Sequence, residues 1–159
     1  MKNFTEASSI SLSLFLVLLF ANSTAVILGS AYAAQLKKIS ATIVMAKAFV
    51  FLIIWCSILS GITISGVLQR FPFPGLPIFF FIVVAGGVGF SLSSTGNLLS
   101  RLPLRHLLLF QSFRLPLEMI LHSWARQGTV PGTMTWTGTN YDIVSGVIVL
   151  AVGIAFSKS

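Results

Sequence analysis

The residues best suited to chemistry form one polar stripe in the second half of the chain. At 100° per residue, five polar side chains fall within an arc of about 120° of a helix: Gln111, Arg114, Glu118, His122 and Arg126. Glu118 lies four residues from both Arg114 and His122, so that the glutamate is able to pair with either. Because histidine titrates near neutral pH and burial tunes a carboxyl group, an Arg–Glu–His set suits a proton relay or an anion site.

Asp142 extends this stripe to a candidate ligand or ion cluster of Arg114, Glu118, His122 and Asp142. The competing interpretation is the solvated face of an interfacial helix, whose arginines snorkel toward water. Metal binding is not predicted, because one histidine and one carboxylate fall short of the three or four ligands of a metal site. The single cysteine, Cys56, lies in an apolar run and excludes an intrachain disulfide. No catalytic residue and no cofactor is predicted.

The composition is that of a membrane protein. Of 159 residues, 55% are hydrophobic and 8% are charged, whereas soluble domains carry about 25% charged residues. Ten Lys and Arg against three Asp and Glu give a net charge of +7. The cations stand at the ends of apolar runs, where they set topology and meet lipid headgroups. The predicted partner is therefore the lipid bilayer and not a nucleic acid.

The apolar runs predict an all-α bundle of about four transmembrane helices in a single domain, 1–159. Three stretches without charge each exceed the roughly 20 residues that cross a bilayer, and a shorter run near the C-terminus follows Asn140, a plausible helix N-cap. The predicted spans cover residues 9–34, 47–69, 75–99 and 140–157. The charge-free part of the last span covers only about 22 Å, against about 30 Å of hydrocarbon. It is therefore predicted to lean on a second protomer or on a partner membrane subunit.

Residues 101–127 form an amphipathic segment before the last span. Pro103 opens one helix and Pro116 either opens a second or kinks a single one, while Gly128 and Pro131 give a helix stop. A full crossing would place Arg114 near mid-membrane at a cost of about 2.5 to 3.5 kcal/mol. The segment is therefore expected to lie at the interface or to pack partly into the bundle. The Thr- and Gly-rich loop at 128–139 is either a surface connection or a short β-hairpin.

The cations predict the orientation in the inner, or plasma, membrane. The first connection between spans is rich in cations, the second holds Arg70 alone, and the third is again rich. The positive-inside rule then places the N-terminus outside and the first and third connections in the cytoplasm. The alternative is a signal peptide cleaved after Ala31-Tyr32-Ala33, although the apolar run is longer than usual for one. The cations of the two rich connections are Lys37, Lys38 and Lys47, then Arg101, Arg105, Arg114 and Arg126.

The run from 113 to 146 resembles the signature block of a family of uncharacterised bacterial multi-pass integral membrane proteins. It covers about a fifth of the chain and implies a helical membrane architecture and the position of the cluster. The family carries no established activity, and its members continue with a further apolar span, so that the chain is C-terminally short relative to them. The matching positions are Arg114, Leu115, Pro116, Glu118, Gly128, Pro131, Met134, Thr135, Asn140, Tyr141, Asp142 and Ile143.

Three classes of function follow from these residues. A non-enzymatic structural or assembly subunit needs only packing surfaces, and this class is favoured. A small transporter or channel subunit would use the Arg–Glu–His cluster as an ion or anion site. A membrane-embedded enzyme would need a second acid or base near Glu118, and Asp142 is the only other acid outside the N-terminal tail.

Overall fold

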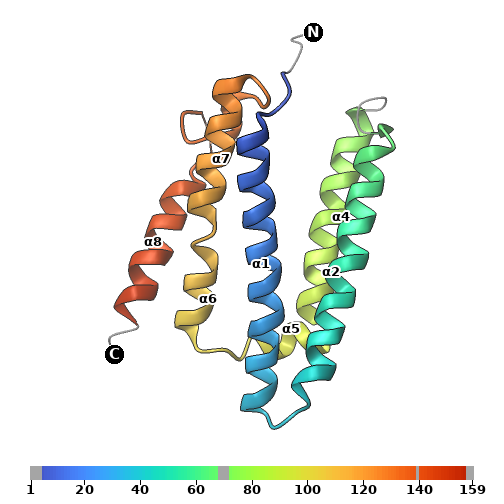
Figure 1. Ribbon diagram of the computed structural model, residues 1–159, viewed down its shortest axis with the longest axis vertical. Helices are drawn as coiled ribbons and strands as arrows, with labels where there is room; N and C mark the ends of the chain where they lie inside the picture. Colours follow the sequence, from blue (N-terminus) through green and yellow to red (C-terminus); the bar gives the residue numbers. More distant parts are fainter. Residues whose placement is uncertain (1–4, 68–71, 139, 157–159) are drawn as a thin grey trace. The chain divides into compact units, whose positions relative to one another are not determined.

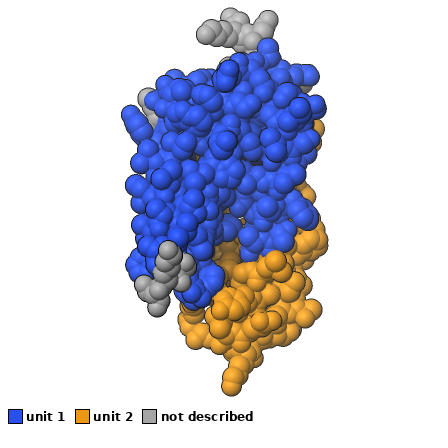
Figure 2. Space-filling view, turned by 60° about the vertical axis from the view of Figure 1, so that its left-hand side comes forward, with its two compact units in different colours: residues 1–25, 103–159 blue, residues 26–102 orange. Residues whose placement is uncertain are grey.

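The computed structural model describes residues 5–67, 72–138 and 140–156, without the side chains of 72–76. These residues form α-helices and one short 3-10 helix, and they contain no strand. The chain divides into two compact units (Figure 2): unit 1 is Met1–Ala25 with Pro103–Ser159, and unit 2 is Val26–Leu102. Helix α1 (Ser9–Leu36) begins in unit 1 and ends in unit 2. The predicted all-α class is confirmed for the described residues.

Unit 1 contains the amphipathic segment as two helices, α6 (Leu104–Gln111) and α7 (Arg114–Gln127). Pro103 immediately precedes α6, and Pro116 lies in the first turn of α7, where a missing amide N–H costs no helical hydrogen bond. Gly128 ends α7 in the left-handed conformation, with a φ of 78°. Of the two alternatives that the sequence left open, two helices or one helix kinked at Pro116, the structure has two helices.

The last helix, α8 (Asp142–Ala155), packs against α6 and α7 within unit 1 (Figure 1). Two glycines make the approach close, since a Cβ on Gly146 would lie 3.0 Å from Leu115 Cγ. A Cβ on Gly153 would lie 3.0 Å from Leu109 Cδ2. Small residues of this kind let helix backbones come together in membrane proteins. The short α8 therefore packs against α6 and α7 of its own chain. Its contact with a second protomer or a partner subunit stays a prediction.

The start of α1 is tied to the end of α7. The backbone N–H of Ser8 donates to Gln127 Oε1 at 2.8 Å, and the Thr5 hydroxyl donates to the Gln127 carbonyl. One turn further on, Trp124 Nε1 donates to the buried Ser11 hydroxyl at 2.9 Å. The rings of Trp124 and Phe15 lie 5.3 Å apart. Side chains of α7 thus bind the chain at the entry to α1.

In unit 2, α1 turns at Lys38, which has a φ of 55°, into α2 (Ala41–Ile64). The helix that carries the predicted second span, 47–69, is longer at its start, because α2 begins at Ala41 and includes Lys47 in its second turn. Residues 68–71, which include Arg70 and the end of that predicted span, lie outside the described residues, as does residue 157 of the predicted fourth span. With 28 and 24 residues, α1 and α2 are both long and apolar enough to cross a membrane.

The predicted third span, 75–99, is wrong in extent because it is two helices, α4 (Pro72–Leu92) and α5 (Ser94–Leu99). Ser93 makes the break: its hydroxyl donates to the Phe90 carbonyl at 2.6 Å and accepts the Gly96 N–H at 3.1 Å. A Cβ on Gly96 would lie 2.2 Å from the Phe90 carbonyl oxygen, so the turn requires glycine. Serine side chains that form hydrogen bonds with the backbone compete with the hydrogen bonds that continue a helix. At Ser93 these side-chain bonds end α4.

Aromatic side chains join α2 to α4 in unit 2. The Phe51 ring lies 4.6 Å from that of Phe90 and 6.3 Å from that of Trp55, on which it stacks. Trp55 in turn lies against the backbone of Gly86, where a Cβ would come within 2.0 Å of the indole. Packing between these two helices therefore depends on aromatic rings and one glycine.

Candidate functional site

Glu118 is the centre of the polar cluster and is 1% exposed, which makes it the largest fully buried side chain among the described residues. Its Oε1 accepts the backbone N–H of Trp136 at 2.8 Å, and its Oε2 accepts Asn140 Nδ2 at 3.1 Å. Both donors belong to the chain that connects α7 to α8. A buried carboxylate needs such donors, because an unsatisfied charge in the interior costs several kcal/mol (about 3 to 5).

Asn140 joins three parts of unit 1. Besides its bond to Glu118, its Nδ2 donates to the Met134 carbonyl at 2.9 Å. Its Oδ1 accepts the backbone N–H of Asp142 at 3.1 Å, at the start of α8. Tyr141 takes the N-cap position by backbone geometry, but the Asn140 side chain supplies the capping oxygen, as in an Asx turn. One amide group therefore holds α7, the connection and α8 together.

The described residues of the connection contain no strand, so it is not the β-hairpin that the sequence allowed. It contains a 3-10 turn, η1 (Gly132–Met134), followed by Thr135, which is fully buried. The Thr135 hydroxyl donates to the Gly132 carbonyl at 3.0 Å and bonds the Thr137 hydroxyl at 2.8 Å. Residues 131–134 are exposed, as a surface connection requires, while Thr135 is buried and Trp136 and Asn140 bind the buried Glu118.

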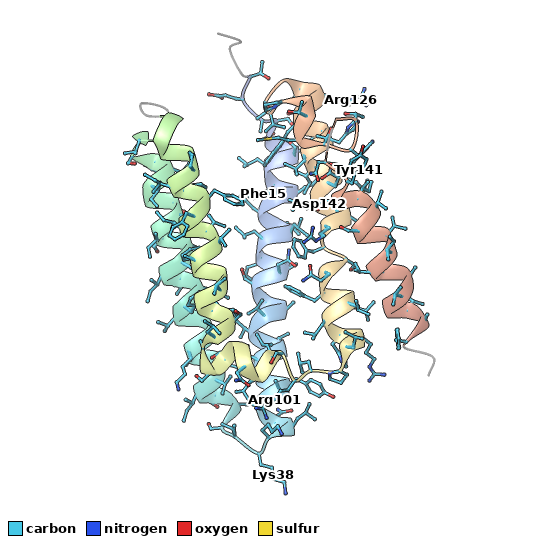
Figure 3. All side chains as sticks on the ribbon, turned by 180° about the vertical axis from the view of Figure 1, so that it is seen from behind. Phe15, Lys38, Arg101, Arg126, Tyr141 and Asp142 are labelled. Carbon is cyan, nitrogen blue, oxygen red and sulfur yellow. The ribbon has the colours of Figure 1, made fainter. Side chains whose placement is uncertain are left out.

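Arg114 pairs with Asp142 and not with Glu118, which corrects the predicted Arg114–Glu118 bridge. Arg114 Nη1 lies 2.6 Å from Asp142 Oδ1, with the two side chains 38% and 51% exposed. Asp142 occupies the first turn of α8, where a negative charge is favoured by the helix dipole. The long arginine therefore reaches outward to a half-hydrated acid, while the shorter Glu118 enters the interior and meets neutral donors. Figure 3 shows Asp142 beside Tyr141 at the start of α8.

His122 is joined to the cluster by its ring. The imidazole stacks on the Trp136 indole with centroids 4.2 Å apart and an interplanar angle of 16°. Its buried Nδ1 has no hydrogen-bond partner among the described residues. The predicted Glu118–His122 ion pair is therefore wrong, and the histidine instead packs on the residue whose backbone binds Glu118.

Burial raises the pKa of the Glu118 carboxyl above its ordinary value. The Trp136 N–H bond lowers this pKa, the charge of Asp142 raises it and His122 lowers it, with burial the strongest effect. Burial thus favours the protonated form of Glu118, and the Trp136 N–H of the connection opposes this effect. Its two bonding partners were missed from the sequence, because Trp136 contributes a backbone N–H that no side-chain pattern reveals. Asn140 was noticed only as a helix cap and as part of the family resemblance.

Among the described residues, no group of three His, Cys, Asp or Glu side chains is placed to hold a metal ion. Two shallow surface grooves lie elsewhere, one along α1 at Ser9–Val17 and one along α2 at Ile43–Ile54. Within the cluster, Glu118 binds Trp136 and Asn140 of the connection, and Arg114 and Asp142 join α7 to α8.

Comparison of the chain with protein-family models, with curated proteins and with solved structures finds no match.

Proposed function

We propose that this chain is a multi-pass integral membrane protein of the plasma membrane that acts as a non-enzymatic structural or assembly subunit. The membrane placement is supported by helices that are apolar on all sides and not covered by protein. Only 6% and 11% of the most apolar stretches of α1 and α2 are buried. A core helix of a soluble protein would be mostly buried, whereas here Ile10, Phe20 and Ile64 are each at least 75% exposed.

The proposed bundle has four spans, α1, α2, α4 and α8. Helix α4 carries the same apolar surface, with Phe80 and Phe81 each at least 70% exposed. With 14 residues, α8 covers only about 21 Å and depends on its packing against α6 and α7. The cation-rich turn at Lys37 and Lys38 is placed in the cytoplasm, which leaves the N-terminus outside.

The non-enzymatic role rests on one observation: both oxygens of Glu118 are bonded by the chain itself. A substrate or ion site would keep at least one of them directed at a cavity. Arg114 and Asp142, the other charges of the cluster, neutralise each other. The polar cluster therefore fixes the end of the bundle where α7 meets α8, as a packing and assembly unit requires.

Extraction and topology experiments test the membrane placement. The full chain in isolated membranes is expected to resist alkaline carbonate, which releases a peripheral protein used as a control. Reporter fusions after Lys38 and Arg126 are expected to report cytoplasm, and a fusion after Arg70 the outer side. Release of the chain by carbonate would refute the placement, and an outward reporter after Lys38 would refute the orientation.

A test of the subunit role separates the buried and the exposed charges. Glu118→Ala is expected to lower the amount of folded protein in the membrane, because two donors lose their acceptor. The double variant Arg114→Gln with Asp142→Asn is expected to accumulate as the wild type does, since an exposed pair stabilises little. Normal accumulation of Glu118→Ala, with loss of a transport or catalytic activity, would contradict the proposal.

A further inference from the structure

Unit 2 carries positive charge without any acid of its own. Residues 26–102 contain no Asp or Glu, and the three acids of the chain, Glu6, Glu118 and Asp142, all belong to unit 1. A cation of unit 2 therefore finds no carboxylate in its own unit. The cations of unit 2 are Lys37, Lys38, Lys47, Arg70 and Arg101.

Lys47 differs from the other cations because it lies within an apolar groove. A shallow groove of about 540 Å³ runs along one face of α2 and includes this lysine. The lining positions recur every three or four residues, which places them in one stripe on the helix. They are Ile43, Ala46, Lys47, Val50, Phe51 and Ile54. Ile43, Val50 and Ile54 are each at least 53% exposed, so the rest of unit 2 leaves this face open.

The position of Lys47 along α2 matches the edge of the hydrocarbon. From Lys47 to the end of α2 at Ile64 the helix rises about 26 Å, close to the roughly 30 Å of a bilayer core. The lysine stem then lies along the apolar groove and its ammonium group reaches the headgroup layer. Val50, Phe51 and Ile54 lie about one and two turns deeper, at the level of the acyl chains.

We infer that this groove binds one anionic phospholipid, with the phosphate on Lys47 and an acyl chain along Val50, Phe51 and Ile54. The inference rests on the membrane placement proposed above. A second copy of the chain is a poorer occupant, because the same face would set Lys47 against Lys47 with no carboxylate in either unit 2. Lys38 and Arg101, which Figure 3 shows at one end of unit 2, favour anionic headgroups in the same leaflet.

Native mass spectrometry of the full chain tests the inference. The protein is delipidated in mild detergent and then offered equal amounts of phosphatidylglycerol and phosphatidylcholine. The wild type is expected to retain phosphatidylglycerol in about fivefold preference. Lys47→Gln is expected to abolish this preference for one bound lipid. Lys37→Gln, which removes the same charge from the same unit outside the groove, is expected to keep it.

A second variant tests the acyl chain. Ala46→Phe fills the groove and leaves Lys47 in place, and it is expected to lower retention of phosphatidylglycerol about as much as Lys47→Gln. Glycerol phosphate, which lacks acyl chains, is expected not to displace the bound lipid. The lipid site would be refuted if Lys47→Gln and Lys37→Gln lost the phosphatidylglycerol preference equally, or if the wild type retained both lipids equally. Neither result would affect the proposed membrane placement. A dimer that Ala46→Phe dissociates would show a second copy in the groove, and release of the wild type by carbonate would refute the membrane placement as well.

Discussion

The two units of the chain are stabilised by different means. In unit 1, a buried carboxylate, an asparagine and several hydroxyl groups form directed hydrogen bonds around Glu118. In unit 2, α2 contacts α4 through the Phe51 ring, which packs on the Phe90 ring, and through the Trp55 indole, which lies against the backbone of Gly86. Unit 2 contains no acid at all. In the membrane placement proposed above, there is little hydrophobic driving force between helices. Close packing would then stabilise unit 2, and polar hydrogen bonds would supply much of the stability of unit 1.

The largest effect is expected for the buried carboxylate of unit 1. Glu118→Ala leaves the Trp136 N–H and Asn140 Nδ2 without their acceptor, and we expect a loss of about 3 kcal/mol in the free energy of unfolding. The measurement is denaturant-induced unfolding in detergent micelles. Glu6→Ala, which removes an exposed acid from the same unit, is the control and is expected to change little. Equal effects of the two substitutions would show that unit 1 does not depend on the buried bonds.

Two adjacent glycines test packing in unit 2. Gly86→Ala would force a methyl group into the Trp55 indole, and we expect a loss of about 2 kcal/mol. Nothing lies within 4 Å of a Cβ on Gly87, so that Gly87→Ala is expected to be neutral or slightly stabilising. Both variants gain the same helix propensity, and their difference in unfolding free energy isolates the ring contact. Two equal values would mean that Trp55 does not determine the stability of unit 2.

The stability of the protein should depend on pH through Glu118 of unit 1. Because the pKa of Glu118 is raised in the folded state, the native protein holds its proton at a pH where the unfolded chain has lost it. The stability from this group is fully present below the unfolded pKa, about 4.5, and is lost as the pH rises through the folded pKa. Unfolding measured from pH 4 to pH 8 (approximate limits) is expected to show this decline in the wild type and not in Glu118→Gln. A decline that persists in Glu118→Gln would assign it to another group.

The smallest effect is expected for the exposed pair of Arg114 and Asp142. A double-mutant cycle of Arg114→Gln and Asp142→Asn is expected to give a coupling energy below about 1 kcal/mol, because both side chains are more than a third exposed. The coupling should fall further at high salt. A coupling of about 3 kcal/mol or more would show that this pair, and not Glu118, holds α7 to α8.

Local signals in the sequence predicted much of the helical layout. Pro103, Pro116 and Gly128 act on their own backbone, and they mark the helix ends of unit 1 correctly. The break at Ser93 was missed, because the serine only ends α4 when its hydroxyl bonds Phe90 and Gly96. A run of Ser and Thr at the end of an apolar stretch fits a continuing helix equally well.

The cluster was predicted in its residues but not in its bonds. Helical spacing placed Arg114, Glu118 and His122 on one helix, and all three do lie on α7. Spacing along one helix says nothing of the connection that folds over it, so the backbone of Trp136 and the side chain of Asn140 were not foreseen as partners. The buried Glu118 accepts hydrogen bonds from neutral donors of that connection, and Arg114 pairs with the more exposed Asp142.

Hydrogen exchange at the Trp136 backbone amide tests most directly whether Glu118 anchors the connection. In the wild type this amide donates to Glu118 Oε1 and is expected to be protected, with exchange slowed about a hundredfold or more relative to an open loop. Glu118→Ala is expected to abolish the protection, while Arg114→Gln is expected to preserve it. An amide at Trp136 that exchanges in the wild type as fast as in Glu118→Ala would contradict the account, because the carboxylate would then hold no connection in place.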